Sequence, residues 1–342
     1  MHTLSDDQKW VLMRHLRSSG ATILTLLTVL ALAVAGCSSS NDSADSDGAE
    51  RVVPTINGDV TIPAEPERVV VLNYALAGYL YDLDVPVVAV TTESTDEKGA
   101  FAKQWADQAD EEGTVLLPWS ADGFDMEAIL EQDPDLIVAG GIGFPFKHAT
   151  AAYDELTKIA PTVIVGDDLT EWQSQYEFIA DKVFGKPEVF HDAVATYDAR
   201  IDEVKNNIAV PDGDSVFLSM LPDGRAYVLI EDRGLPKEFA KVGFRPAPLF
   251  ATGRYEPYTT DGDSFELSTE QIGQVLTQPT LFAAGFNADV TSIAQMRKQP
   301  IWAALPAFQK NQAYDLPYWT QRSDFNESME TLDIIEDTFR KK

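Results

Sequence analysis

Short, unbroken apolar runs alternate with amphipathic segments along the first half of the chain. A run without polar interruption is typical of a strand that is buried on both faces. Strands that alternate with helices predict a parallel sheet covered by helices, with loops at the strand ends available for a ligand. The predicted strands lie at residues 69–72, 87–90, 115–117, 136–139 and 162–165, and the predicted helices at 75–83, 126–131 and 149–159.

The period of the pattern changes after Trp172. Pro187 suits the first turn of a helix, where a proline loses no hydrogen bond. Beyond this helix the pattern predicts a second set of elements, with strands at 216–218, 226–230 and 281–284 and a helix that begins at Thr269. The apolar stripe of the long helix recurs at steps of four and three, at Phe190, Val194, Tyr197, Ile201, Val204 and Ile208.

These patterns predict an α/β protein with two Rossmann-like lobes, at residues 51–170 and 211–342, joined by a helical segment at 171–210. An internal repeat supports two related lobes. Residues 125–140 and 268–285 both begin with a residue that can cap a helix, place a glutamate in its first turn and put a proline before an apolar strand. Ser268 and Gln271 have the spacing of a capping box. Any two α/β units share part of this plan.

The N-terminus carries a different pattern. An apolar run of about 15 residues follows three basic residues and is shorter than the roughly 20 residues of a transmembrane helix. The only cysteine, Cys37, comes directly after it and resembles the lipobox of bacterial lipoproteins, with Val34 where leucine is usual. We expect residues 1–36 to be a cleaved signal peptide, Cys37 to carry a diacylglycerol, and the Ser-, Asp- and Gly-rich residues 37–50 to form a flexible tether. The alternative is an ordinary signal sequence.

Acidic residues dominate the composition, with 55 Asp and Glu against 26 Lys and Arg and a formal net charge of −29. Residues 1–36 carry three basic and two acidic side chains, so the remainder has a charge of about −30. A surface of this sign repels nucleic acids and anionic lipids, so we expect contact with the membrane through the lipid anchor only. If Cys37 is acylated, the mature chain has no disulfide and no thiol nucleophile.

Four motifs in order resemble the substrate-binding lipoproteins of iron–siderophore, haem and vitamin B12 ABC importers. They lie at residues 66–72, 126–138, 267–271 and 302–308, and the resemblance covers roughly residues 52–339. It implies two α/β lobes joined by a single long helix, the class III periplasmic-binding-protein architecture. Such a protein captures a ligand between its lobes outside the cytoplasm, delivers it to ABC permease subunits powered by a cytoplasmic ATPase, and does no chemistry.

The same resemblance assigns the chain a ferric siderophore as ligand. The iron would be held by the siderophore, with no metal bound directly by the protein and no cofactor. We expect a monomer on the extracytoplasmic face of the cell membrane. By motif position, the permease subunits would dock on Glu127 and Glu270. The alternative role of each glutamate is to complement the dipole of its own helix, a contribution of about 0.3–1 kcal/mol.

A receptor for a bulky anionic chelate needs guanidinium groups and aromatic rings. Arg225 is the strongest candidate, because it follows a second-lobe strand where family members often place a ligand-facing basic residue. The alternatives are surface ion pairs for the arginines and packing for the aromatic residues. The second-lobe candidates are Arg225, Tyr227, Arg233, Arg245, Arg254 and Tyr255; those at first-lobe strand ends are Tyr74, Trp119 and Phe144, beside Asn73 and His148; Trp319 and Arg322 lie near the C-terminus.

Other classes of protein have weaker support. The sequence has no Gly-x-Ser-x-Gly motif, no Walker loop and no dinucleotide fingerprint. Only His148 and His191 follow the predicted signal peptide, with no recognisable metal-ligand spacing, and His191 lies off the apolar stripe, where we expect it to be solvated. Haem and cobalamin are the closest alternative ligands, because tyrosine or histidine could ligate haem. A lipid-anchored enzyme on this scaffold is the alternative from another class.

Overall fold

The computed structural model describes residues 48–93, 99–258, 262–286 and 291–341, which belong to one compact unit, Ser46–Lys342. The predicted signal peptide, Cys37 and most of the predicted tether lie outside the described residues. The first described strands are β1 (Glu50–Thr55) and β2 (Gly58–Pro63), which form an antiparallel hairpin. The sequence pattern did not predict this hairpin, because only a few of its side chains, among them Val53 and Ile62, are buried.

The first sheet is parallel throughout and has the strand order β5-β4-β3-β8-β9. Its strands confirm the predicted apolar runs. Val69 and Val71 of β3 belong to one core cluster and Val70 to another, which shows that both faces of the strand are covered. The strands are β3 (Val69–Val71), β4 (Val87–Thr91), β5 (Val115–Leu117), β8 (Leu136–Gly140) and β9 (Thr162–Val165).

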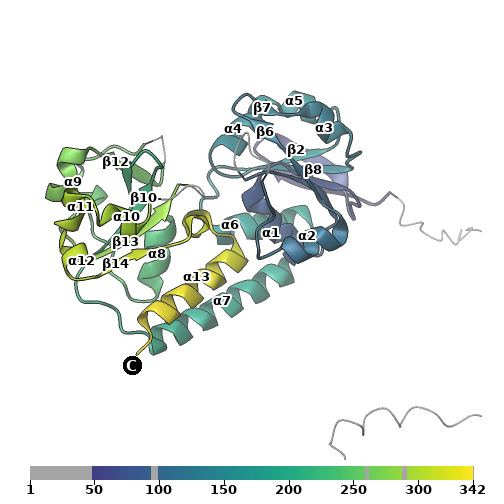
Figure 1. Cartoon of the computed structure of the whole chain (residues 1–342). Helices are drawn as coiled ribbons and strands as arrows, with labels where there is room; N and C mark the ends of the chain where they lie inside the picture. Colours follow the sequence, from purple (N-terminus) through teal and green to yellow (C-terminus); the bar gives the residue numbers. More distant parts are fainter. Residues whose placement is uncertain (1–47, 94–98, 259–261, 287–290, 342) are drawn as a thin grey trace, which may run out of the picture. The chain divides into compact units, whose positions relative to one another are not determined.

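Helices and short strands connect the strands of the first sheet (Figure 1). The helix predicted at 149–159 is wrong in its bounds: α4 begins at Phe144 and ends at Ala151, and α5 (Tyr153–Leu156) follows as a separate turn. Gly143, with φ 81°, and Pro145 in the first turn start α4 early. The other elements are η2 (Tyr74–Leu76), α1 (Ala77–Asp82), α2 (Ala106–Glu112), β6 (Trp119–Ser120), β7 (Gly123–Phe124) and α3 (Met126–Leu130).

The long helix is present as predicted. It follows α6 (Trp172–Glu177) and η3 (Phe178–Val183) and is α7 (Pro187–Asn207), with Pro187 in its first turn. Four residues of the predicted stripe, Phe190, Tyr197, Ile201 and Val204, are buried along α7, and Ile208 is buried just after it. His191 is exposed, as expected from its position off the stripe.

The second sheet has the order β12-β11-β10-β13-β14, in which β10, β13 and β14 run parallel and β11 runs antiparallel to both of its neighbours. This lobe is therefore α/β as predicted, and its sheet is mixed because β11 runs antiparallel. Residues 221–225 are too few for a crossover, so they close a hairpin between β10 and β11. The strands are β10 (Ser215–Met220), β11 (Ala226–Leu229), β12 (Ser264–Leu267), β13 (Thr280–Gly285) and β14 (Ala313–Asp315).

Both predicted caps of the internal repeat are present, one in each lobe. Asp125 accepts hydrogen bonds from the backbone of α3, and Ser268 and Gln271 form the capping box of α9. The helical elements of the second half are α8 (Gly234–Lys241), η4 (Phe250–Thr252), α9 (Thr269–Val275), α10 (Ile293–Met296), α11 (Pro300–Ala303), α12 (Pro306–Gln309), η5 (Tyr318–Arg322) and α13 (Phe325–Phe339).

A second helix, α13, packs beside α7. The sequence did not predict this packing. α13 lies along α7 (Figure 1), and Arg200 of α7 forms ion pairs with Asp333 and Glu336 of α13. At its other end α13 contacts the first lobe, where Asn326 donates to Asp82 of α1 over 2.7 Å. One core cluster continues from the first sheet through α6, α7 and α13 to the second sheet. Both helices therefore join the two sheets.

Candidate functional site

Four aromatic side chains gather at the carboxyl edge of the first sheet. Trp119 follows β5, Phe124 lies on β7, and Phe144 and His148 come from α4. The ring centroids of Trp119 and Phe124 are 5.8 Å apart, those of Trp119 and His148 5.7 Å, and those of Phe144 and His148 6.2 Å in a stacked arrangement. Phe144 is 65% exposed, so one ring of the group faces outward. We call these four residues the aromatic platform.

The platform is held in place by the loops beneath it. The indole nitrogen of Trp119 donates to the carbonyl of Thr92, after β4, over 2.8 Å. Gly123 lies against the imidazole of His148, since a Cβ at this glycine would be 3.5 Å from Nδ1. Nε2 of His148 is buried and has no hydrogen-bond partner among the described atoms. The platform is therefore a packed, preformed surface whose outer ring is Phe144.

Asn73 and Tyr74, predicted beside these residues, have structural contacts of their own. Asn73 is buried, and its amide donates to the carbonyl of Gly140 over 2.7 Å, which ties the end of β3 to the end of β8. The ring of Tyr74 packs on Trp105 at 5.0 Å, and its hydroxyl donates to the carbonyl of Ala100 over 2.8 Å. Burial raises the pKa of Tyr74. Among the described residues, the ring of Tyr74 contacts Trp105 and none of the rings of the platform, and the amide of Asn73 serves to connect two strand ends.

Arg225 lies in the hairpin between β10 and β11. Its Nε donates to Asp223 over 2.8 Å, and its Nη1 donates to the hydroxyl of Tyr227 over 3.3 Å. Tyr227 in turn donates to Glu266 of β12 over 3.2 Å and packs edge-on against Tyr258 at 5.0 Å. The side chains of Arg225 and Tyr227, both predicted as ligand contacts, therefore touch each other. They lie on the same face of the sheet as Glu266.

Arg322 brings the two halves of the candidate site together. It ends η5, after β14, and its Nη2 is 3.7 Å from Oδ2 of Asp263, the residue before β12. A Cβ at Gly143 would lie 3.6 Å from Nη1 of Arg322, so the guanidinium lies close to the turn from which Phe144 and α4 begin. Beside it, Nη1 of Arg233 donates to the carbonyl of Gly262 over 2.7 Å. Arg322 is thus a predicted cation that lies close to the start of α4, which carries Phe144 and His148.

Four other predicted residues lie elsewhere. Arg245 pairs over 3.4 Å with Asp214, the residue before β10. This pair lies at the amino end of β10, whereas Arg225 lies beyond its carboxyl end. Tyr255 stacks on Phe265 at 4.3 Å, on the sheet face that packs into the second core cluster. Arg254 is exposed beside it in the chain. Trp319 lies under Nζ of Lys103 at 5.4 Å, near α2. The contacts of these four residues do not place them beside the platform. Their role in ligand binding stays a prediction.

The sequence did not single out the hydrogen bond that connects the two sheets beside Arg322. The hydroxyl of Tyr318 in η5 donates to Oε2 of Glu93, two residues after β4, over 2.6 Å. Nothing in the local sequence signals this contact, because its partners are 225 residues apart. It fixes η5 against the carboxyl edge of the first sheet, which positions Arg322.

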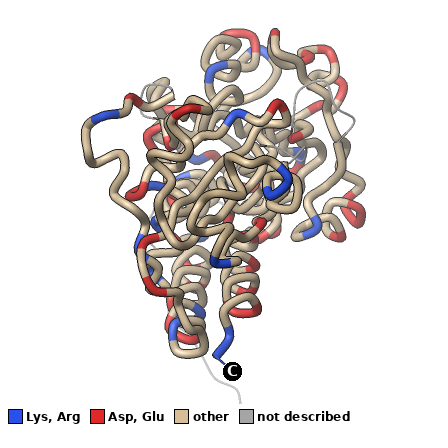
Figure 2. Tube along the Cα trace, turned by 60° about the vertical axis from the view of Figure 1, so that its left-hand side comes forward, with Lys and Arg blue, Asp and Glu red and all other residues tan. Residues whose placement is uncertain are grey.

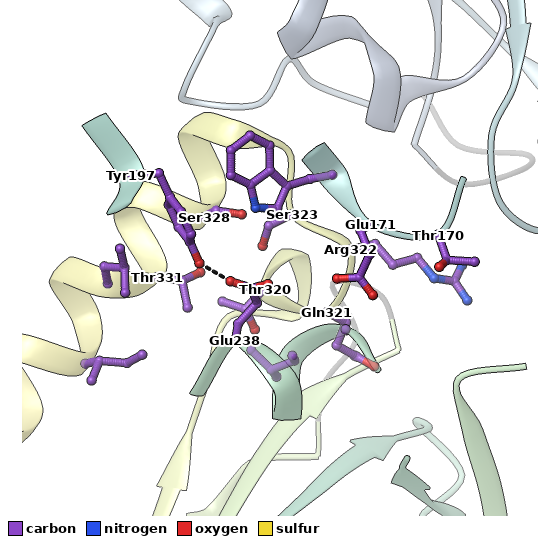
Figure 3. Close-up of a pocket in the computed structure, with 15 residues that line it drawn as sticks. Thr170, Glu171, Tyr197, Glu238, Thr320, Gln321, Arg322, Ser323, Ser328 and Thr331 are labelled. Atoms are coloured by element: carbon purple, nitrogen blue, oxygen red, sulfur yellow. Dashed lines mark hydrogen bonds between the residues drawn. The ribbon is translucent and has the colours of Figure 1, made fainter. Parts of the chain in front are cut away.

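A small hollow lies below this region, where α6, α7, α8, η5 and α13 meet (Figure 3). Its volume of ≈ 50 Å³ is far below the roughly 300–1,000 Å³ of a drug-sized ligand site, so it cannot hold a siderophore. Figure 3 shows the hydroxyl of Tyr197 pointing at Glu238, to which it donates; burial raises the pKa of this carboxyl group. Nε1 of Trp172 and Oγ of Ser328 are buried there without a partner among the described atoms. The hollow suits one or two water molecules.

Buried carboxyl groups gather where α13 meets α1. Asp324 caps α13 in a capping box with Glu327, and a Cβ at Gly78 would collide with its carboxylate. Burial raises the pKa values of Asp324 and Glu327, and each is raised further by a neighbouring carboxylate. Burial also raises the pKa of Asp82 to about 6. This group was not predicted, and it makes the contact between α1 and α13 sensitive to pH.

The two predicted docking residues occupy equivalent places. Glu127 and Glu270 lie in the first turns of α3 and α9, and both are exposed. The pKa of Glu270 is lowered by hydrogen bonds at the helix start, from its own backbone and from Ser268. Figure 2 shows Asp and Glu along most of the described segments, with Lys and Arg at fewer positions. Within the described ranges, no helix has the length and hydropathy of a membrane span.

Comparison with known proteins gives concordant matches. Residues 69–318 match the model of the family described as periplasmic binding protein. The ferric enterobactin-binding periplasmic protein FepB of Escherichia coli O6:H1 is 27% identical over 84% of this chain and 91% of its own. The probable siderophore-binding lipoprotein YfiY of Bacillus subtilis is 24% identical over 94% of this chain and 98% of its own. The crystal structure of holo-ViuP has the same fold, with a TM-score of 0.70 and 23% identity over 85% of this chain and 95% of its own.

Proposed function

The chain belongs to the periplasmic binding protein family, and we propose that it is the extracytoplasmic substrate-binding lipoprotein of an ABC importer that carries a ferric siderophore. The observation that carries the proposal is the meeting of the aromatic platform with Arg322 at Gly143. Aromatic faces pack against flat chelating groups, and a guanidinium group binds their anionic oxygens with directed hydrogen bonds. A ligand held there would touch loops of both sheets.

The relatives support this cargo. FepB is described as binding ferric enterobactin and YfiY as siderophore-binding, and both align over most of this chain. A siderophore supplies all the ligands of its iron, so the protein needs no metal site of its own. Among the described residues no three His, Cys, Asp or Glu side chains are grouped in a way that could hold a metal ion.

A tryptophan-fluorescence titration tests the cargo. The purified mature protein is titrated with ferric catecholate, hydroxamate and citrate complexes, and separately with haem and cobalamin. We expect saturable quenching by at least one ferric siderophore complex, because Trp119 belongs to the platform. Saturable binding of haem or cobalamin alone would favour the alternative cargo of the same family. If none of these compounds binds, the proposed function is wrong and a lipid-anchored enzyme becomes the better hypothesis.

We further propose that the protein does no chemistry and passes its cargo to two permease subunits driven by a cytoplasmic ATPase. Glu127 and Glu270 would dock on basic groups of those subunits, since both are exposed at equivalent helix starts. Converting both to alanine should leave ligand affinity unchanged and abolish uptake in cells. Glu188, an exposed first-turn glutamate of α7, provides the matched control. Normal uptake by the double variant would refute the docking role.

Lipid anchoring is the remaining part of the proposal. A diacylglycerol on Cys37 would keep the receptor beside its permease, and two acyl chains hold a protein on a membrane more firmly than one. Cys37→Ala should release a protein that binds its ligand normally and supports import poorly at low ligand concentration. Fractionation of cells shows the release, and an uptake assay shows the loss. Undiminished uptake would show that the anchor is not needed for delivery.

A further inference from the structure

The chemistry of the candidate site points to one class of siderophore, an inference that rests on the proposed function. We propose that the cargo is an anionic chelate with aryl rings, of the catecholate type. We also propose that Asp263 holds the guanidinium group of Arg322 until the chelate replaces it. This aspartate would then determine specificity, because only a chelate that carries negative charge gains by displacing it.

The platform supplies a surface for aryl rings. Phe144 is the most exposed of its members, and the stacked His148 supports it from within α4. Trp119 and Phe124 close the inner side of the group. Nζ of Lys147 lies over the ring of Phe144, 5.4 Å from its centroid, so an aryl ring that stacks there takes the place of this ammonium group. A flat ring can stack on such a surface with a gain of about 0.5–1.5 kcal/mol beyond the burial of area.

The opposite side of the site supplies positive charge. Arg322 lies close to the turn at Gly143, one residue before Phe144. Arg233 lies beside it, since both arginines contact the segment at residues 262–263. Arg225 lies at the other end of β11, because it precedes Ala226, which pairs with Leu267, whereas Asp263 precedes Ser264, which pairs with Leu229. The two guanidinium groups around residues 262–263 suit a ligand with several anionic oxygens.

Both surfaces together select among the common chelates. A ferric trihydroxamate is uncharged and offers the arginines no net charge. Ferric citrate is anionic and has no ring for the platform. A ferric tricatecholate is a trianion with three aryl rings, so it alone uses both the guanidinium groups and the platform.

The carboxylate beside Arg322 is placed as an exchangeable counter-ion. The side chains of Arg322 and Asp263 are 47% and 41% exposed. Exposed ion pairs of this kind contribute little stability, so a ligand can displace them at low cost. The pair of Arg322 and Asp263, at 3.7 Å, is longer than a hydrogen bond. Arg322 is therefore the group most readily transferred to a ligand.

The test compares two ferric complexes on a set of variants: a tripodal tricatecholate and a tripodal trihydroxamate. Asp263→Asn should tighten binding of the tricatecholate by about two- to fivefold and leave the trihydroxamate unaffected, because it removes a competing anion. Asp214→Asn is the matched control, since Asp214 pairs with Arg245 over 3.4 Å away from the platform. Arg322→Gln should weaken the tricatecholate about ten- to a hundredfold. Phe144→Ala should weaken it about two- to tenfold, and this exposed residue can be removed without opening a core cavity.

The outcomes separate this inference from the proposed function. Tighter binding of the trihydroxamate than of the tricatecholate would overturn the assigned class and leave a siderophore receptor standing. Unchanged or weaker binding of the tricatecholate by Asp263→Asn would overturn the role of the aspartate. If neither these complexes nor ferric citrate bind the native protein, the proposed function fails and the inference fails with it.

Discussion

Replacing the half-buried Asp82 with asparagine should stabilise the protein at neutral and alkaline pH. Asp82 ends α1, and its Oδ1 accepts a hydrogen bond from Asn326 of α13 over 2.7 Å. Burial raises its pKa from 3.8 to about 6, and the charge of Asp84 adds to this rise. An asparagine has the shape of the protonated acid and keeps an oxygen that can accept from Asn326, but it carries no charge.

The sign and size of the effect follow from the raised pKa. The folded state binds the proton of Asp82 more tightly than the unfolded state, so this contribution to stability is complete below about pH 4 and is lost as pH rises through about 6. A difference of about two pH units corresponds to about 3 kcal/mol, and residual contact with solvent reduces the expected gain of Asp82→Asn to about 1–3 kcal/mol at pH 8. Removing the charge also lowers the repulsion felt by Asp324.

Urea unfolding at pH 5 and pH 8 measures this directly. The native protein should lose free energy of unfolding between these values, and Asp82→Asn should lose less, with the larger difference between the two proteins at pH 8. Asp59→Asn, a change at an exposed position of β2, is the control and should follow the native protein. A variant that is less stable than the native protein at pH 8, or that keeps its full pH dependence, would refute the reasoning.

Three further substitutions test other contacts. Gly78→Ala should lower the free energy of unfolding by about 1–3 kcal/mol, because the new methyl group collides with the carboxylate of Asp324; thermal unfolding measures the loss, which a neutral result would contradict. Ser268→Ala removes the capping box of α9 and should cost about 1 kcal/mol in urea unfolding, whereas an unchanged midpoint would show that the cap contributes nothing. Arg200→Met leaves Glu336 with Arg340 as its remaining cationic partner and should lower the midpoint of urea unfolding; native-like stability of this variant would show that the pair is not needed.

The sequence predicts best the elements whose residues are buried in a simple pattern. Strands such as β3 and β8 are buried on both faces, so their apolar runs are unbroken and their positions were predicted within a residue or two. The helix α7 packs along one face, so its stripe has the helical period. The hairpin of β1 and β2 escapes this kind of analysis because most of its side chains are exposed.

The candidate site was predictable in part. Arg225 and Tyr227 are two residues apart in an extended segment, so their side chains share one face and meet, as the structure shows. Tyr255 is equally close to other candidates in the sequence, but it stacks on Phe265 and so packs on the opposite face of the sheet. Closeness in the sequence does not show on which face of the sheet the side chains of a loop pack. The proximity of Arg322 to the turn at Gly143 joins residues that are far apart in the sequence, and no local pattern signals it.

The second helix between the sheets bears on how a ligand is captured. If α7 alone joined the sheets, bending one helix would be enough to move one sheet against the other. α13 packs along α7 and also contacts α1 through Asn326, while Tyr318 connects η5 to Glu93. A large movement would have to disturb both helices and these hydrogen bonds together. Exchange of the exposed partner of Arg322 needs no such movement, so side-chain rearrangement at the site is the less costly response to a ligand.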